Sequence, residues 1–353
     1  MEIFILSDGY IGGASNFLEQ HILYNVKKKN TVYLFDKNYK KTFPNLKNNK
    51  FLKCIRFDPI KDHLKVKKIY YDLKNKHIYF FFTNPVILIL FFIFFLKNNI
   101  NKVILTLHSG IFSWSWKSLI AMPVFSLISL KLDFIIFGSI SAKNWWYSKF
   151  PWMKKIKNNI IYNGIDFPEI IHKKKIKKIR ISFIGRLEKE NNPLLFVNLA
   201  NKMSDNKKFI FNIFGDGSFK NLLKKKAKRI NFWGWKKRSI IYKNTDIVVI
   251  LSPVNNFPYV ALEAIAHGKP VLTNSLGDIR YIIKNNLNGV VVNNSSLAVL
   301  VAKINFIVNN YYKFSKNGLL MSRKYDVTES CGKFWNFITN ANYYFRKKKF
   351  FIQ

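Results

Sequence analysis

Short apolar segments alternate with helical segments along the whole chain, and polar or glycine-rich turns follow the apolar ones. In the first half, Ile3–Leu6, Val103–Leu107 and Phe134–Phe137 have the composition of buried strands. The second half repeats the pattern with Ile181–Ile184 and Phe209–Phe214. Buried strands that alternate with helices are typical of parallel sheets covered on both faces. The alternation therefore predicts an α/β protein made of two doubly wound, Rossmann-like halves.

The length of the chain, 353 residues, suits two domains that each bury a core. We expect an N-terminal domain over residues 1–167, a lysine-rich linker over 168–178 and a second domain over 179–330. The remaining residues, 331–353, are aromatic and helix-like, and such a segment can return to the first domain.

The chain is strongly basic, with 59 Lys and Arg against 19 Asp and Glu and a formal net charge of +40. This balance favours an anionic partner, either nucleic acid or an anionic membrane surface. Only eight of the basic residues are arginine, the type that nucleic-acid sites favour. The lysine excess accompanies heavy use of Asn, Ile and Phe, a set encoded by A/T-rich codons. Genome composition thus explains much of the lysine excess, and the shortage of arginine argues against a specific nucleic-acid partner. The positive charge still attracts the protein to anionic lipid, so we expect a membrane surface as the anionic partner.

Residues 145–155 interleave aromatic and lysine side chains. Two interpretations fit this mixture. Aromatic rings between cations form stacking platforms for single-stranded nucleic acid. Trp and Tyr beside Lys also form membrane anchors at headgroup depth, and we favour the anchor.

The apolar run Ile78–Leu96 is close to the length of a membrane-spanning helix. Pro85 interrupts the run, since it disfavours helical backbone at the preceding residue. We expect a strand over Ile78–Phe82, a turn and then a buried helix over Val86–Leu96, with a membrane span as the alternative.

Cysteine usage and the N-terminal residues bear on the compartment. Cys54 and Cys331 stand alone in the sequence, which favours a reducing cytoplasm. The first residues lack the basic and apolar regions of a secretory signal. We expect a cytoplasmic protein, peripheral on the inner face of the cell membrane.

The segment from residue 255 to residue 270 carries both ends of a short helix. Pro258 suits a first helical turn, Gly268 suits the position past the end, and Pro270 stops continuation. The unpaired N–H groups and the positive dipole end at Phe257, Pro258 and Tyr259 predict an anion site that a nucleotide diphosphate would fit.

This segment resembles the Glu-x7-Glu signature of family 4 glycosyltransferases, the group 1 type, whose members have the two-domain GT-B fold. Glu263 matches the second glutamate of the signature, and Asn255 stands where relatives have the first. The resemblance implies that Glu263 accepts hydrogen bonds from the ribose hydroxyls of a sugar donor. Asn255 would still hydrogen-bond the donor sugar, without a negative charge.

Three landmarks in the first half resemble the same family. Gly12-Gly13-Ala14 matches its Gly-Gly-Ala loop, where backbone approaches donor or acceptor, although such turns are common in nucleotide-binding folds. His108 matches a strand-terminal histidine that faces the donor sugar in relatives; the alternative is a strand-end histidine satisfied by backbone. Asn163 to Asp166 matches a turn before the hinge, in which Asn-Gly is expected to supply a positive φ.

Two landmarks in the second half complete the resemblance. Gly185-Arg186-Leu187 matches the Gly-Arg-Leu of the family, which implies that Arg186 neutralises the leaving diphosphate. The alternative for Arg186 is a surface ion pair with Glu188 or Glu190. Relatives carry a lysine where Asn191 stands.

Gly215, Asp216 and Gly217 match a loop that brings backbone near the nucleotide, although a plain turn is the alternative. The resemblance implies no metal or other cofactor, and the sequence has no clear Asp-x-Asp. Arginine and the helix dipole would handle the diphosphate charge.

The sequence therefore predicts a retaining glycosyltransferase that moves a sugar from a nucleotide-diphosphate sugar to a glycan or lipid-linked acceptor. We expect a role in cell-surface polysaccharide or lipopolysaccharide synthesis, with Arg186, Glu263, His108 and Asn255 as catalytic candidates. Because two charged positions of the family are asparagines here, a weakened relative that binds or scaffolds is the main alternative. An epimerase on a similar fold is another.

Overall fold

The computed structural model describes the backbone of most, but not all, of the chain. The described residues are 3–7, 13–24, 30–34, 52–56, 77–81, 102–108, 123, 125–127, 129–130, 132–167, 178–253, 258–275, 277–293 and 295–337. The chain divides into two compact units: unit 1 comprises Met1–Gly164 and Val327–Gln353, and unit 2 comprises Ile165–Asp326.

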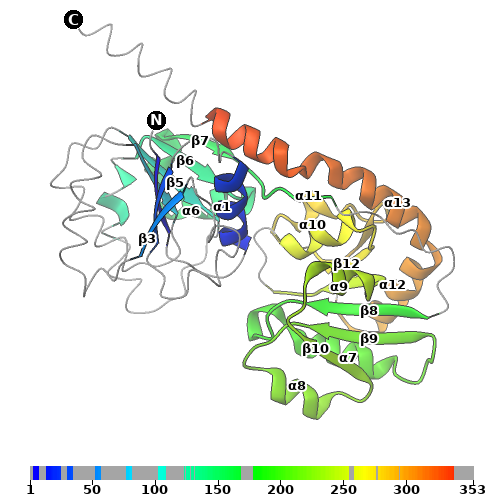
Figure 1. Cartoon of the computed structure of the whole chain (residues 1–353). Coiled ribbons are helices and arrows are strands. Elements are labelled where there is room, and N and C mark those ends of the chain that lie inside the picture. Colours follow the sequence, from blue (N-terminus) through cyan, green and yellow to red (C-terminus); the bar gives the residue numbers. More distant parts are fainter. Residues whose placement is uncertain are drawn as a thin grey trace, which may run out of the picture. The chain divides into compact units, whose positions relative to one another are not determined.

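Unit 1 holds a sheet whose described strands follow the order β3-β2-β1-β4-β5-β6-β7. Strands β3, β5, β6 and β7 are labelled in Figure 1. Its strands are β1 (Ile3–Ser7), β2 (Asn30–Leu34), β3 (Leu52–Arg56), β4 (His77–Phe81), β5 (Lys102–Leu107), β6 (Phe134–Phe137) and β7 (Lys157–Ile160). Its described helices are α1 (Gly13–Tyr24), α6 (Ile140–Lys149), the 3₁₀ turn η1 (Pro151–Lys155) and a helix over 327–337.

Unit 2 holds a second sheet, in the order β10-β9-β8-β11-β12-β13. Its strands are β8 (Ile179–Ile184), β9 (Phe209–Phe214), β10 (Ile230–Gly234), β11 (Ile247–Ile250), β12 (Val271–Asn274) and β13 (Gly289–Val292). Its helices and 3₁₀ turns are η2 (Lys189–Asn191), α7 (Pro193–Lys202), α8 (Lys220–Lys226), α9 (Arg238–Lys243), α10 (Tyr259–Ala266), α11 (Ile279–Ile282), α12 (Leu297–Asn309), α13 (Tyr311–Ser322) and η3 (Arg323–Tyr325).

The two sheets share one topology. Every described strand pair is parallel. Numbered within its own unit, each sheet begins 3-2-1-4-5-6, the strand order of doubly wound dinucleotide-binding folds. In such sheets, ligands bind beyond the carboxyl ends of the strands where the order reverses. In unit 2 this point lies between β8 and β11.

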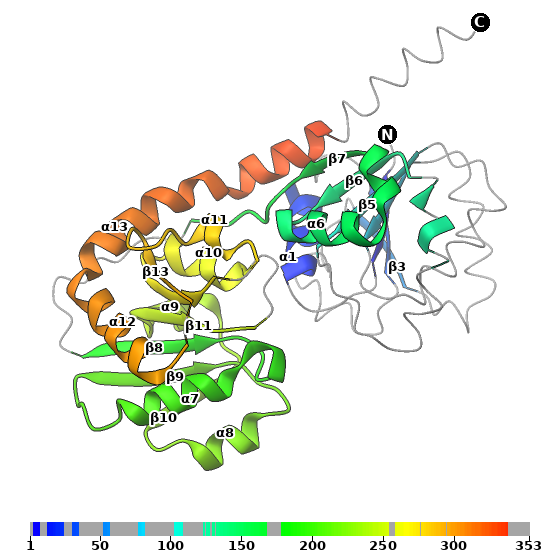
Figure 2. The ribbon, with the colours of Figure 1, turned by 180° about the vertical axis from the view of Figure 1, so that it is seen from behind.

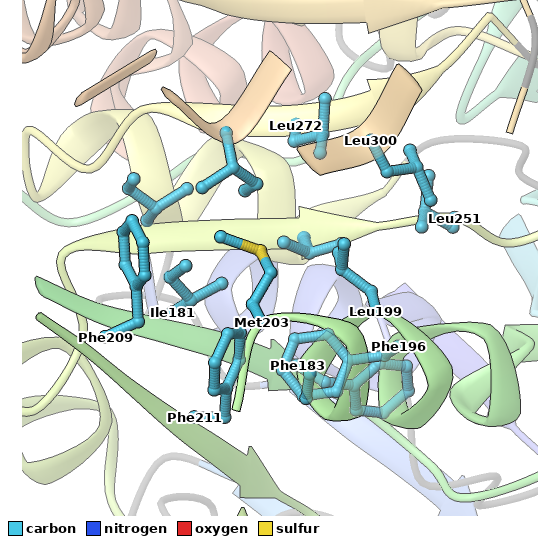
Figure 3. Close-up of a cluster of buried hydrophobic side chains, with 14 of the residues drawn as sticks. Ile181, Phe183, Phe196, Leu199, Met203, Phe209, Phe211, Leu251, Leu272 and Leu300 are labelled. Carbon is cyan, nitrogen blue, oxygen red and sulfur yellow. The ribbon is translucent and has the colours of Figure 1, made fainter. Parts of the chain in front are cut away.

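The core of unit 2 fills one face of its sheet. Phe183, Phe211 and Leu272 from the strands meet Phe196 of α7 and Leu300 of α12 (Figure 3). Helix α12 packs on α7 and on β13, whereas α10 packs on α11, α13, β11 and β12 (Figure 2). Burial of these apolar side chains, at about 25 cal/mol per Å², is the main force that holds the sheet and helices together.

The helix over 327–337 belongs to unit 1, although it follows unit 2 in the chain. The indole Nε1 of Trp335 donates to the carbonyl of His21 at 3.0 Å, and Ser330 Oγ donates to the carbonyl of Tyr162 at 2.6 Å. The chain therefore passes from unit 1 to unit 2 and back. The boundaries lie at residues 164/165 and 326/327, whereas the sequence analysis placed them at 168–178 and 330/331.

The boundary at residue 165 has a local cause. Ile165 donates its N–H to the carbonyl of Tyr325 at 2.8 Å and forms a parallel bridge with Asp326, so it belongs to unit 2. The expected linker, 168–178, lies outside the described residues except for its last member.

Two local expectations are wrong. Helix α1 already begins at Gly13, so Gly13 to Ser15 are helical where we expected a loop. Neither Asn163 nor Gly164 has a positive φ. Gly164 serves close packing instead, because a Cβ there would lie 2.4 Å from the Cα of Val327.

The aromatic and basic stretch, residues 145–155, contributes three side chains to the core. Trp146, Phe150 and Met153 are buried, and the rings of Trp146 and Phe150 stack with centroids 5.4 Å apart. The expectation of a surface platform therefore fails for these residues; the rings of Trp146 and Phe150 pack against Phe125.

The apolar run Ile78–Leu96 is described only in part. It begins within strand β4, as expected, and residues 82–96 lie outside the described part. No helix within the described ranges is long and apolar enough to cross a membrane.

Candidate functional site

Three glycine-containing loops meet at the carboxyl edge of the unit 2 sheet. The N–H of Gly185, after β8, donates to the carbonyl of Phe214 at 3.0 Å. The N–H of Gly215, after β9, donates to the carbonyl of Gly234 at 2.9 Å. A Cβ at Gly215 would lie 1.9 Å from the carbonyl oxygen of Gly185, so only glycine fits there. The loops after β8, β9 and β10 therefore form one packed edge.

Arg186 lies on the first of these loops and is about half exposed. Its guanidinium pairs with the carboxylate of Glu190 at 3.1 Å. The Nδ2 group of Asn191 donates to the carbonyl of Arg186 at 2.9 Å. The described loop thus presents the Arg186 cation beside its own counter-ion, and Asn191 stabilises the loop backbone.

The loop after β9 is held by its own side chains. Asp216 accepts a bond from the N–H of Gly217 at 2.9 Å and pairs with Lys220 at 2.7 Å. The Lys220 bond, followed by the Gly217 bond, lowers the pKa of Asp216. A Cβ at Gly217 would lie 2.6 Å from the carbonyl of Leu187, so this glycine brings the two loops together. Asp216 therefore organises the loop.

Residues after β11 are tied to the Arg186 loop. Ser252 Oγ donates to the carbonyl of Glu190 at 2.6 Å, and Asn274 Nδ2 donates to the carbonyl of Ser252 at 2.9 Å. These bonds join the ends of β8, β11 and β12 at the point where ligands bind doubly wound sheets.

Helix α10 begins beyond this edge, as the sequence predicted. Pro258 is its N-cap residue, with φ −76° and ψ 99°. His267 is its C-cap residue, and Gly268 follows with a φ of +64°. This end is the left-handed glycine termination that the sequence indicated.

Glu263 lies one turn inside α10 and is buried, with both carboxylate oxygens bonded. The Nε of Arg238 lies 2.7 Å from Oε1, and the hydroxyl of Tyr242 donates to Oε2 at 2.9 Å. Burial raises the pKa of Glu263, whereas Arg238 and the Tyr242 bond oppose this shift. The partners that a carboxylate on an apolar helix requires thus come from α9.

Arg238 and Tyr242 are functional candidates that the sequence analysis missed. They lie four residues apart, so they share one face of α9. The scarcity of arginine in a lysine-rich chain is the sequence signal that marks Arg238. Its Cζ lies 5.2 Å from the centroid of the Tyr259 ring, which places the guanidinium beside the first turn of α10.

His108 follows β5 in unit 1 and lies among aromatic rings. Its ring makes an edge contact with Phe17, with centroids 4.6 Å apart. A Cβ at Gly138 would lie 2.4 Å from Nδ1 of His108. Burial, and secondarily the neighbouring His21, lowers the pKa of His108 to about 3. The imidazole is therefore neutral near pH 7.

Three predicted site residues, Gly12, Asn255 and Phe257, lie outside the described residues, and Gly13 is described only as the first residue of α1. Within the described ranges, no three His, Cys, Asp or Glu side chains gather as a metal site would require.

The site lies within a segment that matches a protein-family model. Residues 166–319 match the model described as Glycosyl transferases group 1. This segment is thus similar to a group 1 glycosyltransferase domain. It contains every described element of unit 2 from β8 to α12 and most of α13.

Among the proteins whose sequences are similar to part of this chain are two bacterial relatives. An uncharacterized 41.2 kDa protein in the cps region of Klebsiella pneumoniae is 25% identical over 233 residues, which are 62% of this chain and 64% of that protein. The UDP-Gal:alpha-D-GlcNAc-diphosphoundecaprenol alpha-1,3-galactosyltransferase of Escherichia coli is 31% identical over 160 residues, 39% of this chain and 41% of that enzyme. The chain thus spans less than two thirds of the length of either relative.

A solved structure resembles the fold of nearly the whole chain, not only that of the group 1 segment. HepE of Anabaena, crystallised in complex with UDP, gives a TM-score of 0.80 at 18% identity and covers 96% of this chain and 100% of that one. This likeness and the two doubly wound sheets confirm the predicted GT-B fold.

Proposed function

We propose that the protein is a glycosyltransferase that moves a sugar from a nucleoside diphosphate sugar to a lipid-linked glycan acceptor. In this reaction, the acceptor hydroxyl oxygen forms a bond to the anomeric carbon of the donor sugar. The bond from that carbon to the diphosphate breaks, and the diphosphate leaves with the bonding electrons and takes up the acceptor proton. We further propose retention of the anomeric configuration.

The observation that carries the proposal is the convergence at the carboxyl edge of unit 2. The Gly185 and Gly215 loops follow β8 and β9 and are joined by backbone contacts, and α10, which carries Glu263, follows β11. All three connections leave the carboxyl edge of the sheet. This is where a doubly wound sheet binds nucleotides. The group 1 segment spans the same residues, so unit 2 is proposed to bind the donor and unit 1 the acceptor.

The Escherichia coli relative supports the choice of acceptor and nucleotide, since its name specifies UDP-Gal and a diphosphoundecaprenol-linked sugar. UDP is accordingly the first nucleotide to test. A role in cell-surface polysaccharide or lipopolysaccharide synthesis is consistent with such an acceptor.

A donor screen tests the proposal. The purified protein is heated with UDP-, GDP-, ADP- and dTDP-sugars, and the donor that raises the Tm is then incubated with a polyprenyl-diphosphate-linked sugar. Binding at 100 times Kd stabilises a protein by about 2.7 kcal/mol, which is readily measured. The anomeric configuration of the product, read by NMR, tests retention. Failure to bind or transfer from any donor would refute the proposal.

A peripheral membrane location is proposed from one surface of unit 1. Leu127, Leu130 and Trp152 are exposed by 53%, 69% and 37%, and Lys154 and Lys155, which follow Trp152 closely in the chain, are also exposed. The indole of Trp152 donates to Ser129 Oγ at 2.8 Å, so these segments are in contact. Apolar and aromatic side chains beside lysines suit an anionic headgroup layer.

Sedimentation tests this location. The full chain is expected to pellet with phosphatidylglycerol vesicles and to stay in solution with phosphatidylcholine vesicles. The variant Leu130→Glu should weaken pelleting, whereas Lys207→Gln, which lowers the net charge by the same amount at an exposed position of unit 2, controls for net charge. Equal loss for both variants, or preferential binding of single-stranded DNA, would contradict the proposal.

The alternative function is a weakened relative that binds or scaffolds. It is favoured by Asn191, whose amide is committed to the Arg186 carbonyl, and by the pairing of Arg186 with Glu190. Restoring the family residues separates the two functions. Asn191→Lys together with Asn255→Glu should raise turnover if the site is weakened, and should lower it or leave it unchanged if the site is specialised.

A further inference from the structure

Within the part of the chain that the structure describes, the hydrogen-bond and ion-pair partners of the Glu263 carboxylate come from one helix, α9. Arg238 and Tyr242 both belong to α9, and they take one lone pair on each oxygen. A carboxylate has about four lone-pair positions, so one on each oxygen is left. The side chain of Glu263 keeps 9% of its exposure. A ligand with two neighbouring hydroxyl groups would complete the carboxylate.

Packing holds the Tyr242 side chain of α9 in place against α10. Tyr242 is buried, and its ring stacks on His267 with centroids 4.1 Å apart. The Nδ1 of His267 bonds the carbonyl of Glu263 at 2.7 Å, so ring and backbone fix the same turn of α10. Burial, followed by the charge of Glu263, raises the pKa of Tyr242 well above its usual range, which keeps the hydroxyl a donor.

We propose that Arg238 is a positioning residue of the donor site, which together with Tyr242 holds the Glu263 carboxylate ionised and oriented toward the ribose hydroxyls of a nucleoside diphosphate. This inference rests on the proposed function. It adds that the ribose contact depends on a residue of a different helix, which acts through Glu263.

The charged groups around Glu263 support this assignment. On α9, Arg238 favours the ionised carboxylate, and on α10 itself Tyr259 and His267 are the titratable neighbours. Helix α13 packs on α10 with Ser315, Gly318 and Leu319 around Ile265 and Gly268, and these side chains are uncharged. Strands β11 and β12 contain no titratable residues.

Helix α11, which also packs on α10, contributes Arg280, whose guanidinium lies over the ring of Tyr281, 5.2 Å from its centroid. Arg238 is thus the cation in direct contact with the carboxylate within the described part of unit 2.

Binding of nucleotides with and without the 2′-hydroxyl tests the inference. Kd is measured for UDP, GDP and ADP, and then for the 2′-deoxy form of the tightest binder. The wild-type protein should prefer the ribose form by at least about tenfold, the factor for one hydrogen bond to a charged group. In Arg238→Gln, this preference should fall to about twofold or less, as in Glu263→Gln.

Three further variants give the assignment its specificity. Arg238→Lys keeps a cation and should restore part of the preference, and Tyr242→Phe should reduce it. Lys243→Gln removes one charge from the exposed end of the same helix and should leave the preference unchanged. Circular dichroism and Tm show whether each variant folds; if Arg238→Gln does not, Arg238→Lys and Tyr242→Phe carry the test.

A pH profile supplies a second readout. Without Arg238, burial of Glu263 is offset by the Tyr242 bond and no longer by a cation, so the pKa of Glu263 rises further and the carboxylate fraction falls about tenfold per pH unit below that pKa. As the pH falls, binding by Arg238→Gln should therefore begin to weaken at a higher pH than binding by the wild type.

The measurements distinguish failure of the proposed function from failure of the role assigned to Arg238. Absence of nucleotide binding by the wild type would overturn the proposed function and this inference together. Normal binding with an unchanged ribose preference and pH profile in Arg238→Gln would overturn the inference alone.

Discussion

Gly215 and Gly185 touch through their backbones: a Cβ at Gly215 would lie 1.9 Å from the carbonyl oxygen of Gly185. The contact joins the loops that follow β8 and β9, and the φ of Gly215 is +135°. Glycine is therefore required at this position for two independent reasons, space and conformation.

Replacement of Gly215 by alanine is expected to destabilise unit 2 by about 2 kcal/mol or more, because the backbone must shift to admit the methyl group. Gly234 is the matched control in the same unit. Its φ is +66°, but a Cβ added there would meet no atom within 4 Å, so Gly234→Ala should cost about 1 kcal/mol. Urea unfolding of both variants measures their free energies of unfolding. Equal losses in the two variants would show that the close approach to Gly185 does not constrain Gly215.

The histidines of unit 1 predict acid sensitivity. Burial, the dominant cause, lowers the pKa of His21 to about 4 and that of His108 to about 3, against about 6.5 in an unfolded chain. The unfolded state therefore binds more protons below pH 6.5. Stability is fully present above that pH and falls as the pH drops toward 4, by at most about 1.4 kcal/mol per pH unit for each histidine.

Urea unfolding at pH 7.5, 6.5, 5.5 and 4.5, followed by tryptophan fluorescence, measures this slope. The variants His21→Gln and His108→Gln should each make it shallower. A wild-type slope that neither variant changes would show that other groups cause the acid sensitivity.

Arg186 is expected to act on the leaving diphosphate. Arg186→Gln should lower kcat by about a hundredfold, because one preorganised electrostatic donor is lost. Lys189→Gln removes an exposed charge from the same loop and should change kcat by no more than about threefold. Steady-state kinetics with the donor found by screening measures both, and a larger loss in Lys189→Gln would assign the role to the lysine.

Trp335 ties the helix over 327–337 to α1 through its bond to the His21 carbonyl. Trp335→Phe leaves that carbonyl without its donor, and we expect a destabilisation of about 1–3 kcal/mol. Lys333→Gln removes an exposed ion pair with Glu329 on the same helix and should cost less than about 0.5 kcal/mol. Thermal unfolding of the two variants tests the difference.

Much of the architecture follows from local sequence. The strands Phe134–Phe137 and Phe209–Phe214 coincide with the segments expected from apolar runs bounded by turns. Helix α10 ends as Gly268 and Pro270 indicated. These features depend on side chains and backbone conformations within a few residues, and so they can be predicted from a single sequence.

Other expectations failed because neighbours distant in the chain decide them. Gly164 looked like a turn residue, but its role is to admit Val327 of the helix over 327–337. Trp146 and Phe150 looked like surface aromatics, but they pack against Phe125. Composition cannot distinguish a buried from an exposed aromatic ring when both are flanked by lysine.

The sequence by itself determined the doubly wound halves, the glycine loops and the position of Glu263 on a short capped helix. Only the tertiary structure decided what surrounds that carboxylate. Arg238 and Tyr242 lie on α9, more than twenty residues earlier, and Tyr242 lies 2.9 Å from Glu263 because β11 and α10 bring the chain back. A buried charge must be paired, but its partner is set by the packing of helices, which the local pattern does not encode.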